Sequence, residues 1–288
     1  MWAYSDNFYR KMITEEYLRV VNVMFLNTFK SDIIRCFNLK KIIFILLAFV
    51  AVLLGGQAQY IQICSRFSYE ETHGVVEILG NALLFDKFKI VLVVLLAALH
   101  TNSFCKDDNT HYLRMILNRT NIVYYTWARF LTNMAVVIAL SVLGFILSAV
   151  VLLPFFPTVS LFQHNAFYYD GLAFNYPFLY IIFMGFQFGI VVAAFSSIGL
   201  AFSTFQPNAF VSIGIAGLVF FLSASYIPKN SVFGVLSLIS MLPSFIKSFN
   251  ASQILNASWS IFYPVLVIMA SGYIFYRRLD WRLGNGNV

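Results

Sequence analysis

The chain has 288 residues, of which 60% are hydrophobic and only 11% are charged, and its mean hydropathy is +0.79. This composition is far more apolar than that of soluble domains. The formal net charge of +7 could serve nucleic-acid binding, but in so apolar a chain it indicates membrane orientation and contact with anionic lipid, so we expect no nucleic-acid partner.

Long uninterrupted apolar runs exclude the alternating pattern of a membrane β-barrel. We therefore predict an all-α integral membrane protein that forms one transmembrane domain over residues 1–288. Within it, we expect residues 1–40 to be a cytoplasmic N-terminal segment, residues 41–276 a six-span bundle, and residues 277–288 a cytoplasmic tail.

The first element expected in chain order is an amphipathic helix within the N-terminal segment. Phe25, Phe29, Ile33 and Phe37 repeat every fourth residue, while the charged residues, Asp32 among them, occupy other faces. This spacing predicts an interfacial helix that lies along the cytoplasmic leaflet. The alternative is an ordinary cytoplasmic helix packed on another element.

Six apolar segments then have the length that a membrane-spanning helix requires, about 20 residues. The predicted spans are Lys41–Ile61, Phe88–Phe104, Trp127–Pro154, Phe178–Phe205, Ala209–Ile227 and Trp259–Tyr276. Glycines and serines in the fourth and fifth spans predict close helix packing, within the chain or between two copies. The membrane cores of these six segments carry no clear ionisable group, and His100 and Arg129 lie near the cytoplasmic ends of the second and third, where they can reach the interface.

The distribution of basic residues predicts the orientation of these spans. The side that holds both termini has 14 Lys and Arg, against five on the other side. Because basic residues collect on the cytoplasmic side, we expect a multi-pass protein of the cell membrane, of bacterial plasma-membrane type, with both termini in the cytoplasm.

The polar connectors between spans differ in character. On the outer side, the aromatic connector Phe155–Tyr176 fits the headgroup level and could cap the outer mouth. Val232–Leu242 is apolar but too short to span, and Pro243 follows it. We therefore expect a short re-entrant hairpin, Val232–Ser258, before the sixth span.

The sizeable cytoplasmic loop between spans is Lys106–Thr126, and we expect a short helix in its middle. Asp107, Asp108 or Asn109 could cap the N-terminus of that helix. Such a helix presents aromatic, aliphatic and cationic groups that suit docking of a soluble partner, although a simple basic connector is the plainer interpretation. The docking residues that we predict are Asp107, Asp108, Tyr112, Arg114 and Arg119.

The layout resembles the permease subunits of type-2 ABC exporters, the ABC-2 family. An interfacial helix precedes the first span, the segment THYLRMILNRTNIVYYTWARF is similar to the family's coupling helix between the second and third spans, and Val232–Ser258 is similar to its outer re-entrant element. The resemblance implies a dimer of two such chains, homologous or identical. It also implies a separate cytoplasmic ATPase subunit, docked on each coupling helix, that binds ATP and Mg²⁺.

The chain contains no G-x-x-x-x-G-K-[ST] phosphate loop, which agrees with an ATPase on a partner chain. We therefore expect no cofactor, metal or catalytic residue in this chain. The cargo implied by the resemblance is amphipathic or hydrophobic: a peptide antibiotic or bacteriocin, a drug, or a lipid-linked compound.

Two other classes of function stay open. The first is a carrier driven by an ion gradient, and the second, less favoured, is an integral membrane enzyme. Glu70, Glu71 and His73 invite a metallopeptidase interpretation but lack the expected arginine, and N-capping explains Asp107 and Asp108 more simply than a magnesium site. A purely structural subunit is a further alternative.

Overall fold

The computed structural model describes residues 25–36, 38–66, 73–83, 86–118, 120–159, 170–226 and 253–285. Within these ranges the chain is helical apart from turns and contains no strand, so the all-α class is confirmed. Residues 25–36 are helical. The helices that follow are α2 (Leu39–Gly56), α3 (Ala58–Cys64), α4 (Val75–Ala82), α5 (Asp86–Ala97), α6 (Ser103–Asn109), α7 (Tyr112–Leu117), α8 (Ile122–Leu152), α9 (Asp170–Asn175), α10 (Pro177–Phe202), α11 (Ala209–Tyr226) and α13 (Gln253–Gly284).

Four of these helices are long and apolar enough to cross a membrane: α2, α8, α10 and the part of α13 from Ser258 to Gly284. Several such helices in one chain make this a multi-pass membrane protein. The second and fifth predicted spans correspond to α5 and α11, and the apolar part of α11 covers Ala209–Ser225. The arrangement with six spans stays a prediction.

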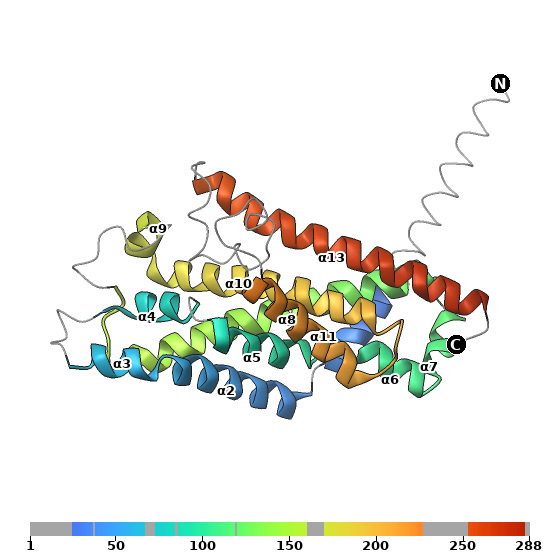
Figure 1. Ribbon diagram of the computed structural model, residues 1–288, viewed down its shortest axis with the longest axis horizontal. Coiled ribbons are helices and arrows are strands. Elements are labelled where there is room, and N and C mark those ends of the chain that lie inside the picture. Colours follow the sequence, from blue (N-terminus) through green and yellow to red (C-terminus); the bar gives the residue numbers. More distant parts are fainter. Residues whose placement is uncertain are drawn as a thin grey trace, which may run out of the picture.

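The long helices lie roughly side by side along the longest axis of the molecule (Figure 1). Helix α10 is central and packs against α8, α13, α11 and α5. One end of the bundle carries the helix of residues 25–36, α6, α7 and the last turns of α13, whereas α3, α4 and α9 lie at the opposite end (Figure 1). The two ends therefore present different segments of the chain.

The first two predicted spans are interrupted. Helix α2 ends at Gly56, and α3 begins one residue after the break at Gln57, whose side chain is buried. In the second span, α5 ends at Ala97 and a turn leads to α6 at Ser103, so the expected continuous helix Phe88–Phe104 is wrong at its C-terminal end. This turn places His100 and its neighbours beside the loop that we predicted to dock a partner.

Small residues bring α10 close to α8 within the chain. A Cβ atom added at Gly185 would lie 2.8 Å from the Cα of Val142, and one added at Gly189 would lie 2.9 Å from the Cα of Ile138. The Ser141 hydroxyl donates a hydrogen bond of 2.8 Å to the Gly185 carbonyl. Close packing of this kind is what small residues allow in membrane helices, as predicted.

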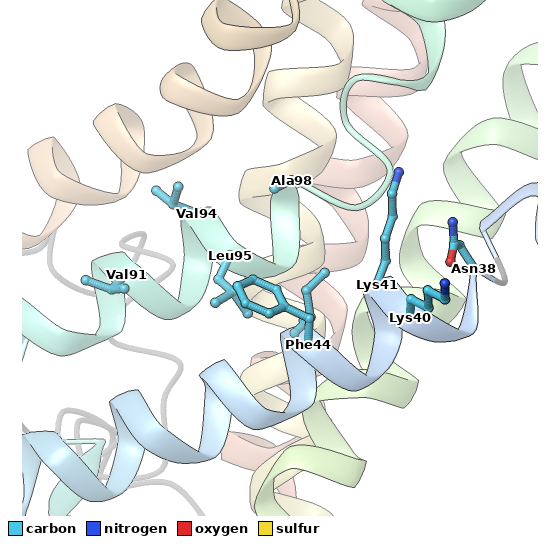
Figure 2. A pocket seen from close by; sticks show the side chains of 9 residues that line it. Asn38, Lys40, Lys41, Phe44, Val91, Val94, Leu95 and Ala98 are labelled. Atoms are coloured by element: carbon cyan, nitrogen blue, oxygen red, sulfur yellow. The ribbon is translucent and has the colours of Figure 1, made fainter.

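An open groove runs between α2 and α5 on the surface of the bundle (Figure 2). Its volume is about 610 Å³. The residues that line it are Asn38, Lys40, Lys41, Phe44, Ile45, Val91, Val94, Leu95 and Ala98. Apart from the first three of these residues, the lining is apolar.

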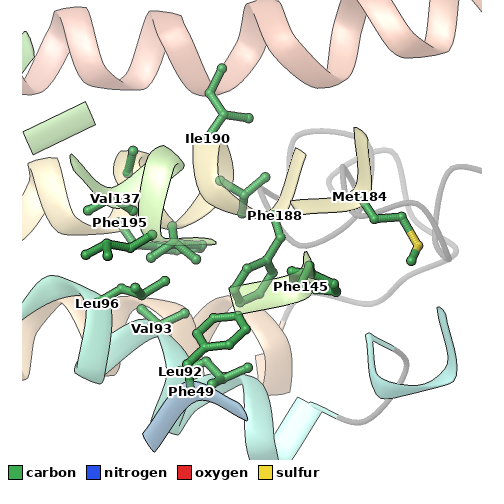
Figure 3. Close-up of a cluster of buried hydrophobic side chains, with 14 of the residues drawn as sticks. Phe49, Leu92, Val93, Leu96, Val137, Phe145, Met184, Phe188, Ile190 and Phe195 are labelled. Carbon is green, nitrogen blue, oxygen red and sulfur yellow. The ribbon is translucent and has the colours of Figure 1, made fainter. Parts of the chain in front are cut away.

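Phenylalanines fill the interior where α2, α8 and α10 meet (Figure 3). The ring of Phe49 meets those of Phe145 and Phe188 edge to face, with centroids 5.8 and 6.3 Å apart, and the last two rings lie 5.9 Å from each other. Aromatic pairs in this geometry add about 0.5–1.5 kcal/mol each beyond the burial of their area. A dry, closely packed core therefore occupies the middle of the bundle.

Three sequence predictions fall on residues that are not described. Phe37 of the predicted interfacial helix, Arg119 of the predicted docking helix and residues 232–252 of the predicted re-entrant hairpin lie outside the described residues.

Candidate functional site

A cluster of buried charges lies at the α6–α7 end of the bundle. Arg129, in the second turn of α8, is 2% exposed, and Asp32 and Asp107 are also buried. The Nε atom of Arg129 is 3.3 Å from an oxygen of Asp32, and its Nη2 atom pairs with Asp107. Arg129 therefore does not reach out to the membrane interface, as the sequence had suggested, but joins two carboxylates from other segments.

Two further side chains complete the cluster around Asp107. The Tyr125 hydroxyl donates a 3.1 Å hydrogen bond to one carboxylate oxygen, and Arg35 Nη1 lies 3.5 Å from the other. The guanidinium of Arg35 also stacks over the ring of Tyr112, 4.1 Å from its centroid. These contacts connect the helix of residues 25–36 with α6, α7 and α8.

Burying three charges is costly unless each one is paired, and removing one partner of such a pair costs about 3–5 kcal/mol. The cluster holds two acids and one fully buried arginine, with half-exposed Arg35 supplying a second positive charge at its edge. Its four charges balance. Moving one of these elements away from the others would leave a buried charge unpaired, so the pairs favour the arrangement in which the elements stay together.

The inner face of the helix at residues 25–36 explains how Asp32 reaches the cluster. Phe25 lies against Phe29 and Tyr124, with ring centroids 6.4 and 6.5 Å apart, and Asp32 follows on the same face. The prediction that Asp32 lies on another face of this helix than Phe25 and Phe29 is wrong. Helical residues three and seven positions apart share a face, so the position of Asp32 relative to Phe25 and Phe29 was the available signal.

The outer face of the same helix carries exposed apolar side chains on either side of exposed Lys30. Leu26 and Ile34 are 57% and 62% exposed, and Ile33 is half-buried at the edge of this face. An apolar face that is exposed beside the first long helix is typical of a helix that lies on a membrane surface.

The predicted cap of the coupling helix is wrong. Asp107 and Asp108 lie within α6, and the residue before α7 is His111, whose φ angle of 54° places it in the left-handed region. Left-handed backbone is uncommon for residues other than glycine and makes a sharp turn. The loop is thus a hairpin of two short helices, α6 and α7, rather than one capped helix.

The predicted docking residues fall into two groups. Asp107 is buried in the cluster, Tyr112 lies under Arg35, and Asp108 accepts a 3.0 Å hydrogen bond from Arg282 of α13. Only Arg114 of the described members is exposed on α7. Asp107, Asp108 and Tyr112 thus hold the α6–α7 hairpin in place. The exposed surface of the hairpin that could meet a partner comes from α7.

Met115 is a surface residue that the sequence analysis did not select. It lies next to Arg114 on α7 and is 67% exposed. Methionine and arginine are each enriched at protein interfaces relative to the rest of the protein surface. Its place in the predicted helix was visible in the sequence, but its exposure depends on the turn at His111.

A small cavity of about 100 Å³ adjoins the charge cluster. The imidazole Nδ1 of His100 lies 3.0 Å from the Cys36 thiol, and its Nε2 is buried without a hydrogen-bond partner. Burial raises the pKa of Asp32, and the opposing attraction of Arg129 is the smaller effect. The cavity therefore brings together three titratable side chains, those of Asp32, Cys36 and His100. No cluster of three potential metal ligands occurs in the described ranges.

Hydroxyl and amide groups link the helices deeper in the bundle. Ser196 donates a 2.8 Å hydrogen bond to Asn133 and lies 3.0 Å from the Thr101 hydroxyl, and Asn133 donates to Ser197 at 3.4 Å. Polar contacts of this kind stabilise helix pairs in membranes by up to about 2 kcal/mol. This network is internal support rather than a binding site.

At the opposite end, His73 has a structural role. Its Nδ1 is 2.8 Å from the Glu77 carboxylate, which also accepts a 3.2 Å hydrogen bond from the Gly74 backbone at the start of α4. A carboxylate that caps a helix N-terminus in this way is a stabilising contact. Glu70 and Glu71 of the metallopeptidase hypothesis lie outside the described residues.

The fold and the site together define a multi-pass helical membrane protein in which a buried charge cluster joins the α6–α7 hairpin to the bundle. No model of a known protein family matches the chain, and no curated protein matches it in sequence.

Proposed function

We propose that this chain is the membrane-spanning subunit of an ATP-driven exporter of the ABC-2 type. Two copies, or this chain and a homologue, would form the pathway, and a separate cytoplasmic ATPase would bind ATP and Mg²⁺. The cargo is an amphipathic or hydrophobic compound, such as a peptide antibiotic, a bacteriocin, a drug or a lipid-linked molecule.

The observation that carries this proposal is the connection of the α6–α7 hairpin to the bundle. Asp107 of α6 pairs with Arg129 of α8, and Arg35 stacks on Tyr112 of α7. A coupling element has to transmit force, and packed elements with paired buried charges move together more readily than a loose loop does. ATPase closure at α7 would thus move α8 and the helix of residues 25–36.

A second contact extends this connection to the last helix. Arg282 lies near the end of α13 and pairs with Asp108 of α6, and both side chains are mostly buried. Movement of the hairpin would therefore reach α13 as well as α8. Since α10 packs against both helices, the whole bundle can respond to one docking event.

The distribution of charge supports a cytoplasmic place for this end. Basic residues of the helix at 25–36, of α6–α7 and of the end of α13 gather there, as the positive-inside rule requires of a cytoplasmic face. In the proposed arrangement α5 and α11 also cross the membrane, giving six spans with both termini inside. The outer face with Leu26, Lys30 and Ile34 then rests on the inner leaflet, its apolar side chains in the membrane and its lysine at the headgroups.

Docking is tested with the two surface residues of α7. The full chain is reconstituted with its ATPase in proteoliposomes, and stimulated ATP hydrolysis is measured for Arg114→Glu and Met115→Asp. Each variant should lose most of the stimulation, because contacts with exposed arginine and methionine anchor interfaces. Lys30→Glu, an exposed charge reversal at the same end, is the control; stimulation equal in all three variants would refute the docking assignment.

The cavity beside Asp32 favours one second candidate, a carrier driven by a proton gradient. Buried acids and histidines inside membrane proteins frequently serve proton transfer. In a carrier, an uncoupler would abolish transport while ATP is held constant. Asp32→Asn would make the remaining transport independent of the proton gradient, so the uncoupler would no longer affect it. In the exporter, transport would follow ATP and ignore the uncoupler.

A further inference from the structure

The groove between α2 and α5 has the properties of a lipid site. Its volume of about 610 Å³ lies within the range of roughly 300–1,000 Å³ that is usual for small-molecule sites. It is open along the side of the bundle rather than enclosed (Figure 2). A ligand can therefore enter it sideways from the surrounding membrane.

The walls of the groove are suited to hydrocarbon. Phe44 of α2 is 71% exposed and Val91 of α5 is 46% exposed, and Val94, Leu95 and Ala98 continue the α5 wall. Since α2 is apolar enough to cross a membrane, these side chains meet acyl chains rather than water. An acyl chain that lies between the two helices would cover them.

One end of the groove is cationic. Lys40 and Lys41 lie in the first turn of α2 and, with Asn38, line one end of the groove (Figure 2). In the described part of the chain, neither ammonium group forms an ion pair with a carboxylate. Their charge is thus available to an anion, and lysines near an anionic leaflet attract it by about 1 kcal/mol each.

We propose that this groove binds one anionic glycerophospholipid from the leaflet at the α6–α7 end. An acyl chain lies between Phe44 and Leu95, and the phosphate lies at Lys40 and Lys41. The two halves of the site match the two halves of such a lipid, whereas a second copy of an apolar helix would leave the lysines without a partner. The inference requires only that α2 spans a membrane and does not depend on the exporter proposal.

The lipid would stabilise the start of α2, directly after the helix of residues 25–36. Lys41 borders both the groove and the cavity of the charge cluster. A phosphate at Lys41 would therefore lie near Asp32 and Arg35, which line the same cavity. A shift of the helix of residues 25–36 would then change the surroundings of the bound phosphate. Lipid binding in the groove would therefore be linked to the position of the helix of residues 25–36.

Native mass spectrometry of the full chain, released from detergent, tests the proposal. Phosphatidylglycerol and phosphatidylcholine with identical acyl chains are titrated separately, and the dissociation constant of the first adduct is compared. Phosphatidylglycerol should bind more tightly, and Lys40→Gln/Lys41→Gln should weaken it by about 30-fold, since each lysine contributes about fivefold. Lys30→Gln removes one exposed charge outside the groove and should change binding by less than about twofold.

A second variant tests the apolar half of the site. Ala98→Trp places an indole in the groove and should prevent the first adduct with either lipid, while the helical circular dichroism signal stays at the wild-type level. Equal binding of both lipids, or unchanged phosphatidylglycerol binding in the double lysine variant, would overturn the proposal. It would also be overturned by a two-chain species without lipid that Ala98→Trp dissociates, because the groove would then hold a second copy.

Discussion

Arg129 Nε lies 3.3 Å from the carboxylate of Asp32, so the helix that precedes α2 is paired with a residue of α8. Both side chains are almost fully buried, at 2% exposure each. A buried ion pair adds little net stability compared with apolar residues, but it fixes which groups can meet. Its place at the base of α8 makes it part of the proposed path from the hairpin to the bundle.

Arg129→Gln should lower the free energy of unfolding by about 3–5 kcal/mol, because two buried carboxylates lose their partner. Equilibrium unfolding in mixed detergent micelles measures this change. Arg129→Gln combined with Asp32→Asn should lose less than the sum of the single variants, since the two residues interact. Strict additivity would mean that the pair does not exist in the folded protein.

Asp107 and Asp108 are adjacent acids with different surroundings and form a matched comparison. Asp107→Asn weakens hydrogen bonds from Arg129 and Tyr125 and should cost about 2–3 kcal/mol, as expected of bonds to a charged group. Asp108→Asn weakens one hydrogen bond, from Arg282, between two mostly buried side chains and should cost less, about 1.5 kcal/mol. The free energies of unfolding of the two variants are measured under identical conditions. A larger loss of stability for Asp108→Asn than for Asp107→Asn would contradict the assigned geometry.

Two glycines, Gly185 at the contact of α10 with α8 and Gly214 of α11, should respond differently to replacement by alanine. Gly185→Ala forces a methyl group against the Val142 backbone and should destabilise the protein by about 1–3 kcal/mol. Gly214→Ala meets nothing within 4 Å and should change stability by less than about 1 kcal/mol. The apparent melting temperatures of the two variants are measured in the same detergent. A similar drop in melting temperature for both would argue against the close approach of α10 to α8 at Gly185.

Cys36 should react slowly with alkylating reagents. Burial and, to a lesser extent, the charge of Asp32 raise the pKa of its thiol to about 11 from an ordinary value of 9.0. Because the thiolate is the nucleophile, iodoacetamide should react at pH 8 about 100-fold more slowly than with an ordinary thiol. The rate should still rise about tenfold per pH unit between pH 8 and 10.

This labelling is measured on a variant with Cys64→Ser and Cys105→Ser, so that one cysteine remains. A rate that levels off above pH 9 would show an unperturbed thiol and an open environment. Adding Asp32→Asn should increase the rate at pH 8, since one negative charge beside the thiol is removed.

The long spans could be predicted closely from the sequence. The predicted third and fourth spans, Trp127–Pro154 and Phe178–Phe205, agree with α8 and α10 to within a few residues. Uninterrupted apolar runs leave the backbone no alternative to a helix in hydrocarbon, so hydropathy alone finds them. Hydropathy does not predict the break between α2 and α3 at Gln57, because the mean over a window hardly changes at a single turn.

The site was predicted only in outline. The loop Lys106–Thr126 was identified by its charge, but a pattern cannot tell a surface acid from one that pairs with a distant arginine. Asp107 looked like a helix cap, and its partner Arg129 looked like an interfacial anchor, because each was considered without the other. A buried arginine requires acids, and that physical requirement was the available signal.

The central claim, that this chain works with a cytoplasmic ATPase through the α6–α7 hairpin, is tested most directly by affinity purification in mild detergent from the native host. The wild-type chain and the Arg114→Glu/Met115→Asp variant are compared at equal recovery, and co-purifying proteins are quantified by mass spectrometry. The account predicts a stoichiometric soluble protein with a phosphate loop that accompanies the wild type and is lost from the variant. Intact, folded wild-type chain that reproducibly purifies without such a protein would contradict it.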